Sequence, residues 1–326
     1  MAKEYVFQHY VPRTYLEAWE NSSGKLRVHK KDSKKFFYKS AQSMLGENDY
    51  YTLKADKLLV LSEQDKLNIF GELTKYIIEL DGHKLTSCEE FAQNYYRYDE
   101  WSISDQYGND VDVHEIKDSV DKKRILDIEK GWHKVEGDWK QVREEIGKTM
   151  DDKSYNLNID ISVKLVNYIT AQKSRNNSKK EEYREIIESL IGFLKDGMTD
   201  KEYNQIISEF TDAYFLKAIR RYHEEKEESL ILKEQELMKN LHIVLYKAVS
   251  GKKYYTSDNP AFTILDTKFY KGKYAGLYFP ITPDIMLALH KGDTYSYTRR
   301  EMPYNMIRRV NQRVVENSNR FYIVPE

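Results

Sequence analysis

The sequence predicts an α+β fold, a single compact domain with a mixed or antiparallel sheet made from N- and C-terminal strands and a largely helical middle. Apolar residues recur about every 3.6 positions through the middle of the chain. Near residue 241 this period changes to about 2, which is typical of strands. Strand-like runs also occur before residue 40. Because strands flank the helices, we expect the two strand regions to meet in one sheet.

The N-terminal half is predicted from local signals. Pro12 suits the first turn of a short helix, and Ser62 followed by acidic residues is typical of a helix start. In chain order, we expect a helix over 12–19, a hairpin of strands over 24–32 and 34–40, a turn near 46–48, helical patterns over 62–80 and 86–101, a loop over 102–113 and helices over 114–148.

The C-terminal half begins with further helices and ends in strands. We expect helices over 159–176, 180–195 and 199–239, a strand–turn–strand unit over 242–260, strands over 261–265, 274–279 and 285–290, a helix over 302–317 and a closing strand over 320–324. These elements are predicted to form one domain over 1–326, with 102–155 as a helical elaboration within it.

Composition limits the class of protein. Lys and Arg number 52 against 53 Asp and Glu, so no global charge favours nucleic acid or a membrane surface, although a local basic patch remains compatible with these totals. Cys88 is the only cysteine, which excludes an internal disulfide and fits a reducing cytoplasm. The start of the sequence has no long apolar run, and no stretch approaches about 18 consecutive apolar residues, so we expect neither a signal peptide nor a membrane span.

The segment QHYVPRTYL at 8–16 is the first candidate site. His9 can act as a general acid or base near neutral pH, and Arg13 can grip a phosphate or carboxylate; Gln8 adds a polar group beside them. The alternative is an N-terminal anchor, with His9 bonded in a turn and Tyr15 in the core. The sequence leaves both open.

A second candidate is GENDYY at 46–51. Glu47 and Asp49 are two positions apart, so on a strand they would point to one face and could hold a divalent metal or share a proton. The alternative is a solvated turn. No histidine spacing matches a zinc site, and no P-loop, GxGxxG, HExxH, GxSxG or CxxC pattern is present.

A third candidate lies in YITAQKSRNN at 168–177. Gln172 and Arg175 continue the apolar helix face of Leu165 and Ile169, so both are predicted to be buried, and Arg175 needs a carboxylate or anion partner. Glu72 and Glu79, on the polar side of the helix predicted over 62–80, are candidate partners. An Arg–Glu pair with a structural role is the alternative.

The fourth candidate is YYTSDNP at 254–260, a strand that runs into a turn. Pro260 favours an extended Asn259, and Asp258 favours a turn bonded through its own side chain. Strand ends of this kind present functional side chains, here Ser257, Asp258 and Asn259. A plain turn is the alternative.

These motifs together resemble a known family. QHYVPRTYL, ENDYYT, ITAQKSR, YYTSDNP, FPITP and VNQRVVENSNRFYIV occur in that order, and the series resembles the bacterial family called domain of unknown function 4238. Two departures are Asn176–Asn177 after Arg175, where the family often has Thr-Pro, and Thr282 for the usual serine; 102–155 matches nothing in the pattern. The resemblance implies His9, Gln172, Arg175, Ser257 and Asp258 as motif positions. It implies a setting in mobile elements or phage defence, and no reaction.

The function we predict is a cytoplasmic phosphodiester hydrolase, a nuclease of defence or toxin type. His9 would be the general acid or base, Arg175 with Arg13 would stabilise phosphate charge, and Asp258, with Glu47, would orient His9 or hold Mg²⁺ or Mn²⁺. The partner would be a nucleic acid or nucleotide. The alternatives are a non-catalytic module that binds an anionic ligand or a partner protein, and motifs that are structural alone. The hydrolase requires His9 and Arg175 to converge on Asp258.

Overall fold

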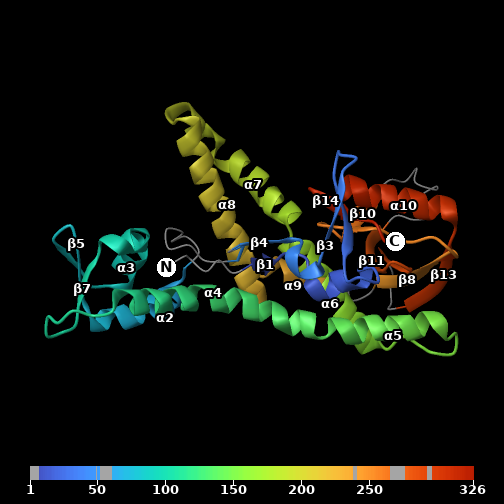
Figure 1. Ribbon diagram of the computed structural model, residues 1–326, viewed down its shortest axis with the longest axis horizontal. Helices are drawn as coiled ribbons and strands as arrows, with labels where there is room; N and C mark the ends of the chain where they lie inside the picture. The colour runs from blue at the N-terminus through green and yellow to red at the C-terminus, as the bar shows by residue number, and fades with distance from the viewer. Residues whose placement is uncertain (1–6, 49, 52–60, 238–240, 265–275, 292–295) are drawn as a thin grey trace. The chain divides into compact units, whose positions relative to one another are not determined.

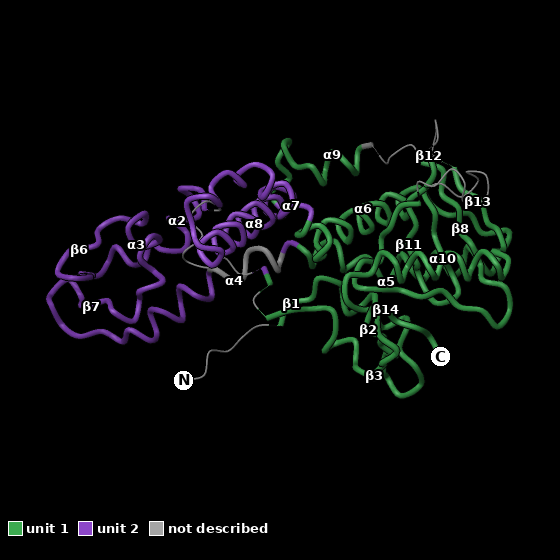
Figure 2. Tube along the Cα trace, turned by 90° about the horizontal axis from the view of Figure 1, so that it is seen from above, with its two compact units in different colours: residues 1–50, 132–181, 224–326 green, residues 51–131, 182–223 purple. Residues whose placement is uncertain are grey.

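The computed structural model describes residues 7–48, 50–51, 61–237, 241–264, 276–291 and 296–326. The fold is α+β (Figure 1). The chain divides into two compact units, each made from separate stretches of sequence (Figure 2). Unit 1 comprises 1–50, 132–181 and 224–326, and unit 2 comprises 51–131 and 182–223. The predicted elaboration over 102–155 falls partly in each unit.

Unit 1 contains sheets of five, four and two strands among the described residues. The five-stranded sheet has the order β10 (Phe262–Ile264), β11 (Gly276–Thr282), β12 (Ile285–Lys291), β8 (Leu241–Ala248) and β13 (Ser296–Met302). The four-stranded sheet has the order β3 (Phe36–Lys39), β2 (Leu26–Lys30), β14 (Phe321–Ile323) and β9 (Thr256–Ser257). The two-stranded sheet pairs β1 (Phe7–His9) with β4 (Gly46–Asn48).

The four-stranded sheet joins the two ends of the chain, as the sequence predicts. β2 and β3 form the expected hairpin, and β14 pairs with β2 on one side and with β9 on the other. One face is buried through Leu26, Val28, Thr256 and Ile323. Alternate residues of these strands point to the opposite face, because side chains alternate along a strand. Residues 8–16 come before β2, the first strand of this sheet along the chain, and the C-terminal strand β14 lies between β2 and β9.

The five-stranded sheet packs against α10 (Tyr304–Asn317). Met306, Ile307, Val310 and Val314 recur at helical spacing on one face of α10 and join a core with Tyr246, Tyr278 and Met286 from the sheet. β8 is central, since it pairs antiparallel with β12 and parallel with β13. The register between β11 and β12 shifts between Pro280 and Thr282, which fits a proline that cannot donate to the ladder.

The other helices of unit 1 are mostly those the sequence predicts. They are α1 (Arg13–Leu16) continued by the 3₁₀ helix η1 (Glu17–Trp19), the 3₁₀ helix η2 (Ala41–Ser43), α5 (Trp139–Asp151), α6 (Ile159–Arg175) and α9 (Leu230–Leu237), while α4 (Val113–Gly137) and α7 (Asn177–Ile191) contribute residues to both units. The side chain of Asn158 caps α6 by accepting from the Asp160 N–H, which fixes where this helix begins.

Unit 2 combines helices with a three-stranded sheet of order β6 (His83–Leu85), β5 (Ile77–Leu80) and β7 (Ser102–Ser104). Its helices are α2 (Glu63–Phe70), α3 (Cys88–Asn94) and α8 (Asp200–His223), with 3₁₀ helices η4 (Gly71–Lys75), η5 (Tyr95–Glu100) and η6 (Gly192–Gly197). Capping boxes begin α2 at Ser62, as the sequence predicts, and α3 at Ser87, within the helical pattern predicted over 86–101.

Five expected elements are wrong in type, extent or partner. The turn predicted near 46–48 is strand β4, which pairs with β1. The helix predicted over 62–80 ends at Phe70, and the β-branched pair Ile77–Ile78 starts a strand. The loop predicted over 102–113 contains β7, and the helix predicted over 199–239 is interrupted after His223. The unit predicted over 242–260 is not a hairpin, because β8 pairs with β12 and β13 whereas β9 pairs with β14. Within the described part of the chain, no helix is long and apolar enough to span a bilayer.

Candidate functional site

The N-terminal motif is fixed by backbone pairing. β1 pairs with β4 so that Gln8 faces Glu47 and His9 faces Gly46, and Gln8 is buried. A Cβ at Gly46 would approach the Gln8 carbonyl oxygen to 2.6 Å, so only glycine allows the strands to come this close. The N–H groups of Tyr10 and Val11 both donate to the Leu45 carbonyl. The segment is therefore an ordered part of unit 1.

His9 is half-buried, and its protonation is set by its surroundings. Nε2 lies 3.2 Å from the Ala41 carbonyl oxygen, which can only accept, so Nε2 carries the proton and the neutral ring has its lone pair on Nδ1. Burial lowers the pKa of His9 below its ordinary value; the Arg175 and Arg13 guanidinium groups act in the same direction, and the Ala41 carbonyl and Glu136 oppose them. The imidazole is thus neutral at pH 7.

Arg175, at the C-terminal end of α6, is 2% exposed. Its Nη1 donates to the Glu136 carboxylate at 2.5 Å, its Nη2 donates to the His9 carbonyl oxygen, and its guanidinium lies 4.5 Å from the centre of the Trp132 ring. The prediction that Arg175 is buried and paired with a carboxylate is confirmed. Its partner is Glu136, whereas Glu72 pairs with Lys123 and Glu79 lies in β5.

Tyr15 and Trp19 tie the N-terminal motif to the C-terminal strands. The Tyr15 hydroxyl lies 2.6 Å from Thr256 Oγ1 and donates to the Pro280 carbonyl oxygen at 2.9 Å. Trp19 Nε1 donates to the Tyr254 carbonyl oxygen at 3.2 Å. These contacts join QHYVPRTYL, YYTSDNP and FPITP through buried hydrogen bonds, so these motif positions hold the fold together.

Asp258 is 1% exposed, and both of its oxygens are bonded to backbone. Oδ1 accepts from the Asn319 N–H at 2.7 Å, and Oδ2 accepts from the Arg320 and Phe321 N–H groups at 2.6 and 3.0 Å. Burial raises the pKa of Asp258, although these three donors act in the opposite direction. The carboxylate closes the turn that leads into β14 and does not contact His9.

The two polar neighbours of Asp258 are also bonded. Ser257 Oγ accepts from the Asn259 N–H at 3.1 Å, which makes a local turn. Asn259 Oδ1 accepts from Asn176 Nδ2 at 2.8 Å, and its Nδ2 donates to the Asn317 carbonyl oxygen at 3.1 Å. Asn176 follows Arg175 directly, so the end of α6 connects His9 to the turn at 257–259 indirectly.

The remaining predicted site residues are dispersed. Gln172 is buried as predicted, and its Oε1 has no hydrogen-bond partner among the described residues. Arg13 is exposed and pairs with Glu17 at 3.1 Å. Glu47 accepts from Arg320 Nη2 at 2.7 Å, and Asp49 lies outside the described residues. Within the described ranges, no group of three or more His, Cys, Asp or Glu side chains is placed to hold a metal.

The structure therefore brings His9 and Arg175 together, without Asp258. Glu136 and Trp132, which contact Arg175, were not among the predicted site residues. They are four positions apart in α4 and share a face. The spacing of Trp132 and Glu136 could have predicted that the two share a face of α4. It does not indicate which distant side chain that face contacts.

Unit 1 also contains a cleft of about 590 Å³. Residues of η1, the β11–β12 turn and the C-terminus line it, including Trp19, Pro283 and Glu326. Its carboxylates outnumber its cations, Arg143 and Lys253, and Lys253 already pairs with Asp284 at 2.7 Å. None of the predicted site residues lines this cleft, and its charge does not favour an anion.

Comparison with known proteins identifies a family. No curated protein and no solved structure matches the chain. The family described as "Protein of unknown function (DUF4238)" matches residues 8–324, which includes each motif from His9 to Tyr322. Because this match spans nearly the whole sequence, the chain belongs to the DUF4238 family.

Proposed function

We propose that this chain is a non-catalytic binding module for an anionic ligand. The observation that carries the proposal is the charge of the β2–β3 hairpin. Residues 25–39 contain seven lysine and arginine residues and one aspartate, in a chain whose net charge is −1. Charge concentrated in this way creates a local positive potential that the whole-chain total conceals.

The hairpin lysines are available to a ligand. Those that are exposed are Lys25, Lys30, Lys34, Lys35 and Lys39, and none has a carboxylate partner among the described residues. Some exposed cations elsewhere on unit 1 do have a carboxylate partner, as Lys247 has in Asp151 at 3.0 Å. Binding of an anion by these lysines would cost little free energy, because no existing ion pair has to be broken.

The motif residues support binding over catalysis. Asp258 is bonded to three backbone N–H groups, Arg175 to Glu136 and the His9 carbonyl, and Asn259 to Asn176 and Asn317. The Asp258 carboxylate is held by the backbone of 319–321 and makes no contact with His9, so it does not orient the imidazole. We therefore assign these residues to the architecture of unit 1.

A phosphodiester hydrolase is the second candidate, favoured by His9 itself. A neutral imidazole beside Arg175 and Arg13 has the protonation state of a general base near pH 7, in a field suited to phosphate. In this candidate, His9→Ala removes cleavage and leaves folding intact, with a rate loss of about 10²–10⁴-fold.

One experiment tests both candidates. Purified wild type is titrated with polyphosphate, duplex DNA and single-stranded DNA and RNA, and the same nucleic acids are incubated with Mg²⁺ or Mn²⁺ and then with EDTA. We expect binding that weakens with salt and is reduced in Lys34→Gln/Lys35→Gln, but not in the control Lys122→Gln/Lys201→Gln, which removes two exposed lysines of unit 2. Cleavage that His9→Ala abolishes would instead establish the hydrolase, and absence of binding to every polyanion would refute the module.

A further inference from the structure

Aromatic rings follow one another across the outer face of the four-stranded sheet. Phe36, His29, Tyr322 and Ser257 stand opposite one another in register on β3, β2, β14 and β9. The His29 ring stacks with Phe36 at 5.4 Å and with Tyr322 at 5.1 Å, measured between ring centres. Tyr322 in turn stacks with Tyr255 at 6.4 Å. We call Arg27, His29, Phe36, Tyr38, Tyr255 and Tyr322 the aromatic face.

The aromatic face is open at the hairpin. Phe36 and Tyr38 are each 47% exposed, although large apolar rings are costly to leave in water. The Arg27 guanidinium lies 4.5 Å from the centre of the Phe36 ring. Arg27 Nε and His29 Nε2 have no hydrogen-bond partner among the described residues. These two atoms are buried, so what the face offers to a ligand is its exposed rings.

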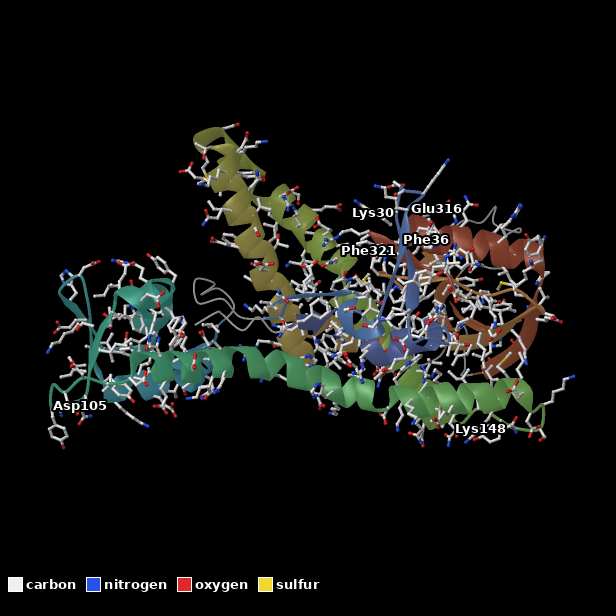
Figure 3. All side chains as sticks on the ribbon, in the orientation of Figure 1. Lys30, Phe36, Asp105, Lys148, Glu316 and Phe321 are labelled. Atoms are coloured by element: carbon white, nitrogen blue, oxygen red, sulfur yellow. The ribbon has the colours of Figure 1, made fainter. Side chains whose placement is uncertain are left out.

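Positive charge lies beside these rings, in the β2–β3 turn. Lys34 and Lys35 lie in the β2–β3 turn and Lys39 at the end of β3. Lys30 on β2 and Lys39 on β3 alternate with the ring-bearing residues, so they point to the opposite face of the sheet. Figure 3 labels Lys30 and Phe36 on the hairpin near Phe321. Lysines on an edge strand such as β3 also discourage pairing with other chains. That role needs no exposed rings, so it does not explain the combination.

We infer that the aromatic face binds single-stranded nucleic acid, with unpaired bases packed against Phe36 and Tyr38 and phosphates held by Lys34 and Lys35 of the β2–β3 turn. The inference rests on the proposed function, because it names the anion that the module takes. Rings in a basic setting are what single strands require, since every unpaired base has an exposed π-face and every linkage a negative charge. A duplex hides its base faces, so it can use the lysines but not the rings.

The test is binding of labelled oligonucleotides, read by fluorescence anisotropy. The probes are single-stranded DNA and RNA of about 15 nucleotides, near the upper size of one such site, the matching duplex, and unlabelled polyphosphate as competitor. We expect wild type to bind the single strands more tightly than the duplex. Phe36→Leu and Tyr38→Leu should each weaken single-strand binding by at least about fivefold, with little effect on duplex or polyphosphate.

Two controls separate rings from charge. Phe193→Leu removes a ring that is more exposed than Phe36 but lies in unit 2, and should leave affinity unchanged. Lys34→Gln/Lys35→Gln should weaken binding of every polyanion and reduce the slope of log affinity against log salt by about 1.4 for single strands, which corresponds to two phosphate contacts. Circular dichroism of each variant checks that the sheet is retained.

The outcomes distinguish the inference from the proposed function. If duplex and polyphosphate bind as well as single strands and neither ring variant matters, the module binds polyanions by charge alone and the inference is overturned. If no polyanion binds, both are overturned. Tighter binding of RNA or of DNA identifies which single strand the face favours. Either result supports the inference, provided that the Phe36 and Tyr38 variants weaken that binding.

Discussion

Arg175 is the residue on which the candidate site depends most. Its buried guanidinium donates hydrogen bonds to Glu136 and to the His9 carbonyl oxygen, and it also packs against the Trp132 ring. We expect Arg175→Ala to lower the free energy of unfolding by roughly 3–5 kcal/mol, because it leaves a largely buried carboxylate and a carbonyl without their donor.

Urea unfolding of wild type and Arg175→Ala measures this effect. The matched control is Arg184→Ala, which breaks a surface pair with Glu188 at 3.0 Å and should cost less than about 1 kcal/mol. Equal losses in the two variants would contradict a structural role for Arg175.

Asp258 is a second residue whose role can be tested by a single atom exchange. Asp258→Asn keeps the size of the side chain but replaces one accepting oxygen with a donating NH₂ group. Whichever way the amide turns, a donor then faces at least one backbone N–H of residues 319–321. We expect a loss of about 1–3 kcal/mol in urea unfolding. A variant as stable as wild type would show that the turn into β14 does not need the carboxylate.

His9 gives a prediction about pH. The pKa of His9 in the folded chain lies below its ordinary value of 6.5, chiefly because of burial, with Arg175 acting in the same direction. Between the folded pKa and 6.5, the unfolded chain therefore binds more protons than the folded chain. Stability should rise with pH through that window and fall on acidification, with no further loss below the folded pKa.

The check is urea unfolding of wild type and His9→Gln over a pH series from neutral to acid. Wild type should lose stability relative to the variant as the pH falls below 6.5. The pKa of His29 is also lowered, by burial and by Arg27, but that residue is present in both proteins and its effect cancels. Parallel curves would contradict the burial assigned to His9.

At the residue scale, the sequence predicted whether a side chain is buried better than it predicted which residue that side chain contacts. The burial of Gln172 and Arg175 followed from a helix face shared with Leu165 and Ile169, because helical spacing is local. Glu136 could not be chosen as the partner, because its helix meets α6 only through the tertiary fold. The backbone role of Asp258 was likewise invisible, since its donors lie 61 to 63 positions away.

At the scale of elements, α1 illustrates how a very short helix is held. Arg13–Leu16 is too short to be stable alone, so its position depends on what it contacts. Tyr15 fixes the position of α1 through hydrogen bonds to Thr256 in β9 and Pro280 in β11. Tyr15→Phe should cost about 1–3 kcal/mol, because the buried Pro280 carbonyl loses its donor while packing is unchanged.

Thermal or urea unfolding of Tyr15→Phe tests this connection. Tyr107→Phe, at an exposed tyrosine in unit 2, is the control and should stay within about 0.5 kcal/mol of wild type. If Tyr15→Phe behaves like this control, the hydroxyl does not hold α1 against the strands.

Elements with strong local signals were predicted, and those defined by pairing were not. The capping boxes at Ser62 and Ser87 and the amphipathic α10 have signals within the element itself. β13 was missed because SYTRREM is polar and its place depends on parallel pairing with β8. The partner of a strand depends on contacts with residues far away in the sequence. A single sequence with two similar strand regions does not specify which strands pair.

At the scale of the whole molecule, each unit is completed by distant stretches of chain. Unit 1 needs both ends of the sequence, because β14 stands between β2 and β9. The sequence predicted this meeting because strand regions flank the helical middle of the chain. It could not predict which residues divide between the units, since both units contain amphipathic helices of the same general character.

The place of β14 leads to the last prediction. Ending the chain at Ser318 removes β14 and the three N–H groups that bind Asp258, so that β2 and β9 both lose a partner and a buried carboxylate loses its donors. We expect amide exchange in 26–30 and 36–39 to become fast, because the hairpin alone is only marginally stable in water.

The control ends the chain at Val324, which keeps β14 and the bond from the Val324 N–H to the Arg27 carbonyl but removes the surface contacts of Glu326 with Asn21 and Tyr38. Hydrogen exchange read by mass spectrometry should show protection in the control close to that of the full chain. Because α2, α3 and α8 belong to unit 2, their protection should change least in either truncation. Retained protection of β2 and β3 in the shorter chain would mean that the hairpin, with its exposed lysines, is held by contacts other than those of the C-terminal strand.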